Sequence, residues 1–241
     1  MKYALQSDER IEATPKASGS CPCCETEVTA VCGTRKVWHW RHKNKLICDH
    51  WWENETQWHR DWKDHFFKEW QEVVHVAEGG EKHIADVKTP SGLVIEFQHS
   101  AISPDEKSAR ESFYQDMIWV VDGRRLKRDF PRFCERRSDW RKWPFNETTY
   151  DNNAFHLFPA EWLKRNVPVV FDWGYEEPQY NSSSKLSRTR LICLLPSVHG
   201  YGAHCFPIRL TDFVNMIIER QKLTIPPLAD QPKPNRFELE N

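Results

Sequence analysis

The sequence contains no apolar run long enough to cross a bilayer, which excludes a membrane-spanning protein. Of its 241 residues, 29% are charged, and the mean hydropathy is −0.75. The first ten residues lack the apolar stretch of a secretory signal and already include acidic side chains. We therefore expect a soluble cytoplasmic protein. In a reducing compartment its eight cysteines are expected to serve zinc binding, catalysis or packing, and not disulfides.

A strong excess of positive charge is also absent, because the formal net charge is −1. Proteins that bind nucleic acids by charge alone usually have a strongly basic balance, so any such surface must be local. The stretch 124–142 carries nine Lys and Arg residues against three acids, interleaved with Phe130, Phe133 and Trp140. This pattern suits phosphate contact and base stacking, and a solvated connector is the alternative. The predicted nucleic-acid contacts are Arg124, Arg125, Lys127 and Arg128.

Composition divides the chain into five segments without internal repeats. They are a Cys/His-rich module (1–50), a core (51–123), a basic connector (124–151), a C-terminal α+β region (152–223) and a proline-rich tail (224–241). The C-terminal region is predicted to contain strands at 167–173 and 190–195 and a helix at 210–220. His199, His204 and Cys205 are predicted to be loop residues and not a metal site.

The segment from Glu55 to His75 is predicted to be an amphipathic helix, because its apolar residues recur at helical spacing. Glu55, His59 and Lys63, four residues apart, project onto the apolar face. Buried ionisable groups need a partner or a function, so these three are candidate site residues. The alternative is that the first turn extends beyond the core and the groups are solvated.

A β-hairpin is predicted next, since two β-rich runs flank the turn Pro90-Ser91-Gly92. Counting back from this turn sets Asp86 directly opposite Glu96, on one face of the sheet. Gln98 lies two residues beyond Glu96 and so shares that face. Three polar groups are therefore expected to converge.

A helix beginning at Pro104 is predicted after the hairpin, with Ser103 as its N-cap and Glu106 in the capping box. The apolar run 117–121 after it is typical of a buried parallel strand. Strand, helix and strand then form a right-handed crossover unit.

Two opposed carboxylates would repel each other unless a cation lies between them, so Asp86 and Glu96 predict a Mg²⁺ or Mn²⁺ site. Such a site can activate water and stabilise charge on phosphoryl oxygens during phosphodiester hydrolysis. Ordinary surface acids on an exposed hairpin are the alternative.

The N-terminal module contains a second set of candidate ligands. Cys21 and Cys24 form one close pair, and His39 and His42 form another 14 residues later, which is typical of a tetrahedral zinc site. Unliganded cysteines in a flexible arm are the alternative. Other possible ligands crowd the same stretch and leave the choice open, namely Cys23, Cys32, Cys48 and His50.

The strings Ala85-Asp86-Val87 and Ile95-Glu-Phe-Gln-His-Ser100, preceded by Glu55, His59 and Lys63, resemble the nuclease core of the CoiA-like competence family, which belongs to the PD-(D/E)XK group. The Cys-Pro-x-Cys and His-Trp-x-His elements are similar to those that precede this core. The resemblance covers roughly residues 19–123. It implies an α/β restriction-endonuclease-like fold with a mixed central sheet and flanking helices, preceded by the zinc module.

The resemblance further implies that Asp86 and Glu96 bind the catalytic metal ion, with Glu55, His59 and Lys63 in support. Gln98 occupies the position where most of the group has a lysine that orients the attacking water. Gln can hydrogen-bond this water but supplies no charge, and Lys63 could provide it. We expect a Mg²⁺-dependent deoxyribonuclease with structural zinc. The alternatives are a non-catalytic zinc-bearing DNA-processing accessory protein and a structural interaction module.

Overall fold

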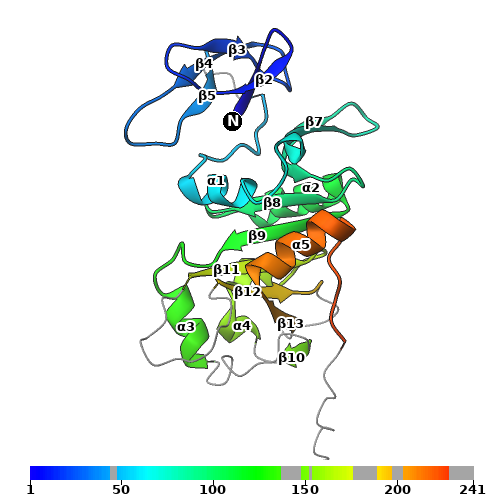
Figure 1. The fold of residues 1–241 in the computed structure, drawn as a ribbon. Helices are drawn as coiled ribbons and strands as arrows, with labels where there is room; N and C mark the ends of the chain where they lie inside the picture. Colours follow the sequence, from blue (N-terminus) through cyan, green and yellow to red (C-terminus); the bar gives the residue numbers. More distant parts are fainter. Residues whose placement is uncertain (44–47, 137–147, 152–153, 176–188, 197–202, 228–241) are drawn as a thin grey trace, which may run out of the picture. The chain divides into compact units, whose positions relative to one another are not determined.

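The structure is a computed structural model of the chain and describes all residues except 44–47, 137–147, 152–153, 176–188, 197–202 and 228–241 (Figure 1). The chain forms two compact units, Met1–Val121 and Asp122–Asn241. Both combine helices with β-sheet, so the expected α/β class is confirmed. In the part of the chain that is described, no helix could cross a membrane, and the longest helices have 11 residues where a span needs about 20.

The first unit begins with a five-stranded antiparallel sheet in the order β2-β1-β3-β4-β5, drawn in blue in Figure 1. Its small core is formed around Ala4, Val28 and Trp40, all nearly inaccessible to solvent. The cysteine-bearing turn at residues 21–24 lies between β3 and β4. The strands are β1 (Tyr3–Gln6), β2 (Glu9–Glu12), β3 (Ser18–Ser20), β4 (Glu27–Val31) and β5 (His39–His42).

The second part of this unit is a mixed sheet with helices. In the sheet, β6, β7 and β8 pair antiparallel in sequence order, and β9 pairs parallel to β8 after a helical crossover. Its helices and strands are α1 (Gln57–Lys63), the 3₁₀ turn η1 (Lys68–Trp70), β6 (Gln71–Val76), β7 (Lys82–Lys88), β8 (Val94–Gln98), α2 (Pro104–Tyr114) and β9 (Met117–Asp122).

The predicted helix from Glu55 to His75 is wrong in its second half. The helix α1 ends at Lys63, and β6 pairs antiparallel with β7, which places Val74 opposite Ile84. The reason is that β6 includes adjacent β-branched valines, which favour a strand once a partner strand is available. Apolar residues at helical spacing therefore continue beyond Lys63, although the helix itself ends there.

The hairpin, the capped helix and the parallel strand are confirmed. Val87 pairs with Ile95, and the Thr89 N–H donates to the Leu93 carbonyl at 2.9 Å, which is the predicted register. At the start of α2, the Ser103 hydroxyl accepts from the Glu106 N–H at 3.1 Å, which confirms the N-cap. The Glu106 carboxylate instead pairs with Arg110, so the predicted capping box is not completed. Glu96 in β8 lies beside Trp119 in β9.

The second unit contains strands in the order β10-β13-β12-β11, all antiparallel. The two predicted strands and the predicted helix are confirmed, as β11, β12 and α5. Its elements are α3 (Asp129–Arg136), β10 (Thr149–Asp151), α4 (Ala154–Leu157), the 3₁₀ turn η3 (Ala160–Trp162), β11 (Val169–Tyr175), β12 (Thr189–Leu194), β13 (Ala203–Ile208) and α5 (Leu210–Arg220).

Two predictions for this unit are corrected. His204 and Cys205 lie in the strand β13, not in a loop, while His199 lies outside the described residues. Phe133 was expected to stack on bases, but it is fully buried on Trp173, with ring centroids 5.0 Å apart. An aromatic residue on the inner face of a helix packs in the core, whatever the charge of its neighbours.

Candidate functional site

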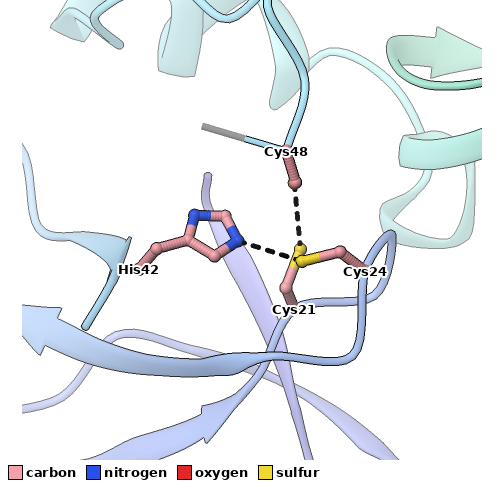
Figure 2. Close-up of side chains that lie close together, drawn as sticks. All are labelled: Cys21, Cys24, His42 and Cys48. Atoms are coloured by element: carbon pink, nitrogen blue, oxygen red, sulfur yellow. Dashed lines mark hydrogen bonds between the residues drawn. The ribbon is translucent and has the colours of Figure 1, made fainter. Parts of the chain in front are cut away.

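Four cysteine and histidine side chains from three segments of the first unit lie together (Figure 2). Cys21 and Cys24 come from the turn after β3, His42 ends β5, and Cys48 precedes the core helix. Their ligand atoms all lie within 4.8 Å of one another, with Cys21 Sγ 3.7 Å from Cys48 Sγ and Cys24 Sγ 3.3 Å from His42 Nε2. A tetrahedral site with Zn–S bonds of about 2.3 Å has ligand-to-ligand edges of about 3.8 Å. The cluster therefore has the donor types and spacing that could bind zinc.

The fourth member of this cluster is Cys48, not the predicted His39. In the strand β5, side chains alternate between the two faces, so His39 and His42, three residues apart, point to opposite sides. The ring of His39 is instead 2.9 Å from the Val37 carbonyl through Nδ1. Strand periodicity could have excluded the His39 and His42 pair from the sequence, but only the fold brings Cys48 to the cluster.

The pKa values of the cysteine thiols in the cluster are shifted in different directions. Burial raises the pKa values of Cys21 and Cys48. Burial also acts on Cys24, but hydrogen bonds, first from Thr26, lower its pKa overall. Zinc binds thiolates, so loading this cluster would release protons from Cys21 and Cys48.

The second constellation is the carboxylate pair on the hairpin. The backbone pairing of β7 with β8 ends at Val87 and Ile95. At the next position, Asp86 and Glu96, hydrogen bonds between side chains and backbone N–H groups join the two strands. The Asp86 N–H donates to Glu96 Oε1 at 3.2 Å, and the Phe97 N–H donates to Asp86 Oδ2 at 3.0 Å. The two carboxylates thus lie side by side, as the predicted register requires.

Lys63, at the end of α1, places its ammonium among three carboxylates. Its Nζ is 2.9 Å from Asp86 Oδ1, 3.0 Å from Glu72 Oε1 and 3.2 Å from Glu55 Oε1. Burial disfavours the charged ammonium, but the three carboxylates, Asp86 first, raise the pKa of Lys63 well above its usual range. The prediction that Lys63 lies on the inward face of the helix is confirmed, and Glu72 is a partner that the sequence did not indicate.

Arg110 is a second buried cation that sequence reasoning missed. It lies in α2 and its Nη1 donates to Glu96 Oε2 at 3.1 Å, while Nη2 donates to Glu106 and to the carbonyl of Trp51. Burial, followed by the charge of Asp86, raises the pKa of Glu96 to about 8, and Arg110 opposes this rise. The i, i+4 spacing of Glu106 and Arg110 is a sequence signal of an ion pair, but it does not indicate the link to Glu96.

Gln98 and His59 both lie near Glu53, another residue that the sequence did not indicate. The Gln98 amide donates to Glu53 Oε2 at 2.9 Å, and the Ser100 N–H donates to Oε1 at 2.6 Å. His59 accepts the Thr56 N–H at Nδ1, which leaves Nε2 as its protonated nitrogen. This Nε2 is buried, has no hydrogen-bond partner among the described residues and lies 3.9 Å from Glu53 Oε1. Burial lowers the pKa of His59 and raises that of Glu53.

A short segment, 48–53, connects the two constellations. Asp49 accepts from the Ile84 N–H and contacts His83 Nδ1 at 2.8 Å, which fixes it to β7. Trp51 stacks on His83, with ring centroids 3.3 Å apart, and its carbonyl holds Arg110. Asp49, the residue after Cys48 of the Cys/His cluster, is thus bonded to the strand that carries Asp86.

A cavity of about 540 Å³ joins these groups within the first unit. It is lined by members of the Cys/His cluster, by the carboxylate pair and by side chains from the β4–β5 connection. Among its lining residues are His42, Cys48, Glu55, His59, Lys63, Asp86, Glu96 and Arg110. Tyr114 also lines it but is buried, consistent with a packing role.

The predicted phosphate contacts belong to the second unit, where Arg124, Lys127 and Arg128 are exposed and Arg125 is half-buried. The Arg124 guanidinium lies 5.7 Å from the centre of the Phe130 ring. Trp140 lies outside the described residues. These four cations are available to an anionic partner, but no described feature identifies one.

Comparison of the chain with protein-family models, with curated proteins and with solved structures finds no match. The function must therefore be argued from the geometry of the two sites.

Proposed function

We propose that the chain is a Mg²⁺-dependent deoxyribonuclease with a PD-(D/E)XK-type core, similar to the CoiA-like proteins, and that the Cys₃His cluster is its structural zinc site. The observation that carries the proposal is the pairing of Asp86 with Glu96 at the point where backbone pairing of β7 and β8 gives way to side-chain contacts. The mixed sheet with its crossover helix agrees with the core that the resemblance implies.

The donor set suits a hard divalent cation, because carboxylate oxygens are the ligands that Mg²⁺ and Mn²⁺ prefer. Asp86 and Glu96 would hold the ion, and each oxygen that accepts one hydrogen bond keeps a second lone pair for it. The Asp86 side chain is 22% exposed and lines the cavity, so an ion and a phosphate can reach it. When bound, the ion would activate water and stabilise charge on the phosphoryl oxygens.

The chain's own residues would supply positioning and charge. Lys63 fixes Asp86 at 2.9 Å and provides the positive charge that Gln98 cannot. Arg110 holds Glu96 from the other helix. His59 Nε2–H, which has no hydrogen-bond partner in the described part of the chain, lies 3.9 Å from Glu53 Oε1 at the cavity wall, where it can donate a hydrogen bond to a water molecule or a phosphate oxygen.

The test is cleavage of plasmid and single-stranded DNA with Mg²⁺, Mn²⁺ or chelator. Asp86→Asn and Glu96→Gln should each abolish metal-dependent cleavage while the protein stays folded. Asp105→Asn is the matched control, since Asp105 is an exposed acid of α2. An Asp86→Asn protein that cleaves at the wild-type rate would refute the assignment.

One observation favours a second candidate, a non-catalytic DNA-processing accessory protein. Lys63 and Arg110 already neutralise the carboxylate pair, and the amide of Gln98 is bonded to Glu53. A core whose buried negative charges are already paired with Lys63 and Arg110 can be stable without a divalent ion. Wild-type protein that binds DNA but is inert with both metals would support this candidate.

A further inference from the structure

Two exposed tryptophans lie at or near the cavity that is lined by the carboxylate pair. Trp52 lines this cavity and is 47% exposed. Trp38 is 48% exposed and does not line the cavity itself, but it lies in the sequence between the lining residues Lys36 and His39. Its carbonyl accepts a hydrogen bond at 2.7 Å from Arg60, which pairs with the cavity-lining Glu55. Large apolar side chains are generally buried, so two indoles exposed near one polar cavity indicate a binding surface.

Cations from the same part of the fold line the cavity. Lys36, in the β4–β5 connection, and Arg41, in β5, are both exposed and both contribute to the lining. Neither forms an ion pair within the described ranges, in contrast to Lys63 and Arg110 deeper in the site. Free positive charge on the wall of the cavity that also contains the carboxylates suits a ligand that carries phosphates.

The combination of indole faces and phosphate-binding cations is typical of proteins that bind single strands. Base stacking requires open base faces, which paired and stacked bases inside a duplex do not offer. The cavity volume of about 540 Å³ is in the range of small-molecule pockets, so it can admit individual nucleotides but not a double helix.

We propose that the cavity binds an unpaired strand of DNA, stacking bases on Trp52 and Trp38 and holding phosphates at Lys36 and Arg41. This inference rests on the proposed nuclease function for the choice of DNA, and it adds the strand class of the substrate. A phosphate placed between Arg41 and the carboxylate pair would then be the one exposed to hydrolysis.

The experiment measures binding of a labelled thymidine oligonucleotide to the full chain by fluorescence anisotropy, in chelator, so that cleavage plays no part. The wild-type protein should bind the single strand at least tenfold more tightly than a duplex of the same length. Trp52→Ala should weaken single-strand binding by roughly tenfold or more, and Trp38→Ala should act in the same direction. Trp52→Phe should retain most of the affinity because it keeps a stacking face.

Matched controls separate this surface from general effects. Phe67→Ala removes an aromatic side chain that is equally exposed, at 47%, from a stretch, 64–71, that contributes no residue to the cavity wall, and it should leave binding unchanged. Lys36→Gln with Arg41→Gln should lower the salt dependence of binding, whereas Lys43→Gln, at an exposed ion pair with Glu27, should alter it less.

Two outcomes would overturn the proposal: duplex binding as tight as single-strand binding, or wild-type affinity in Trp52→Ala and Trp38→Ala. Single-strand binding through Trp52 by a protein that is inert with Mg²⁺ and Mn²⁺ would refute the nuclease function but uphold this surface. Metal-dependent cleavage with no preference for unpaired strands would uphold the nuclease function but refute the single-strand binding surface.

Discussion

Replacement of Lys63 by methionine is the most direct test of the charge arrangement in the core. Methionine retains much of the side-chain volume but removes the ammonium, which lies within 3.2 Å of carboxylate oxygens of Glu55, Glu72 and Asp86. Breaking a buried ion pair by removing one partner typically costs about 3–5 kcal/mol, because an uncompensated charge remains. All three carboxylates keep other partners, since Arg60 pairs with Glu55, the N–H groups of Lys2 and Tyr3 donate to Glu72, and the Phe97 N–H donates to Asp86.

We therefore expect a loss at the lower end of this range, about 3 kcal/mol, which corresponds to a fall in melting temperature of roughly 10 °C. Thermal and urea unfolding followed by circular dichroism measure both quantities. The matched control is Lys43→Met, which breaks an exposed pair with Glu27 and should cost at most about 1 kcal/mol. A Lys63→Met protein as stable as the Lys43→Met protein would contradict the reasoning.

The remaining predictions concern the zinc cluster, the titration of Glu96 and the basic surface. Purified protein should carry about one zinc per chain, which Cys48→Ser should lose and His39→Ala should keep; metal analysis decides, and retention in Cys48→Ser would contradict the ligand set. The raised pKa of Glu96, about 8, means that the folded metal-free protein holds a proton that the unfolded chain releases above about pH 4.5. Stability should therefore fall as the pH rises from about 4.5 through about 8, by at most about 1.4 kcal/mol per pH unit, and Glu96→Gln should flatten this dependence in urea titrations. An unchanged slope in Glu96→Gln would show that other groups cause it. Neutralising four cations together should weaken DNA binding and reduce its salt dependence, as measured by anisotropy; these are Arg124, Arg125, Lys127 and Arg128. An unchanged affinity and salt dependence would indicate that this stretch is only a solvated connector.

The sequence by itself determined the local features of the core. A two-residue period and a Pro-Ser-Gly turn are enough to set Asp86 opposite Glu96, and a Ser-Pro-x-Glu string is enough to start α2. These predictions succeeded because hairpin register and helix capping depend on residues close in sequence. The extended helix to His75 failed for the opposite reason, since only the partner strand β7 makes 71–76 a strand.

The tertiary structure decided which distant residues complete each site. His39 is not in the Cys/His cluster because β5 turns its two histidines to opposite faces, and the fold brings Cys48 to Cys21 in its place. Lys63, Glu96 and Gln98 acquire partners from a strand, a helix and a loop whose spacing in the sequence carries no such signal, namely Glu72, Arg110 and Glu53 respectively. Side chains far apart in the chain are brought together by packing, and the charge balance around Asp86 and Glu96 exists only after that packing has occurred.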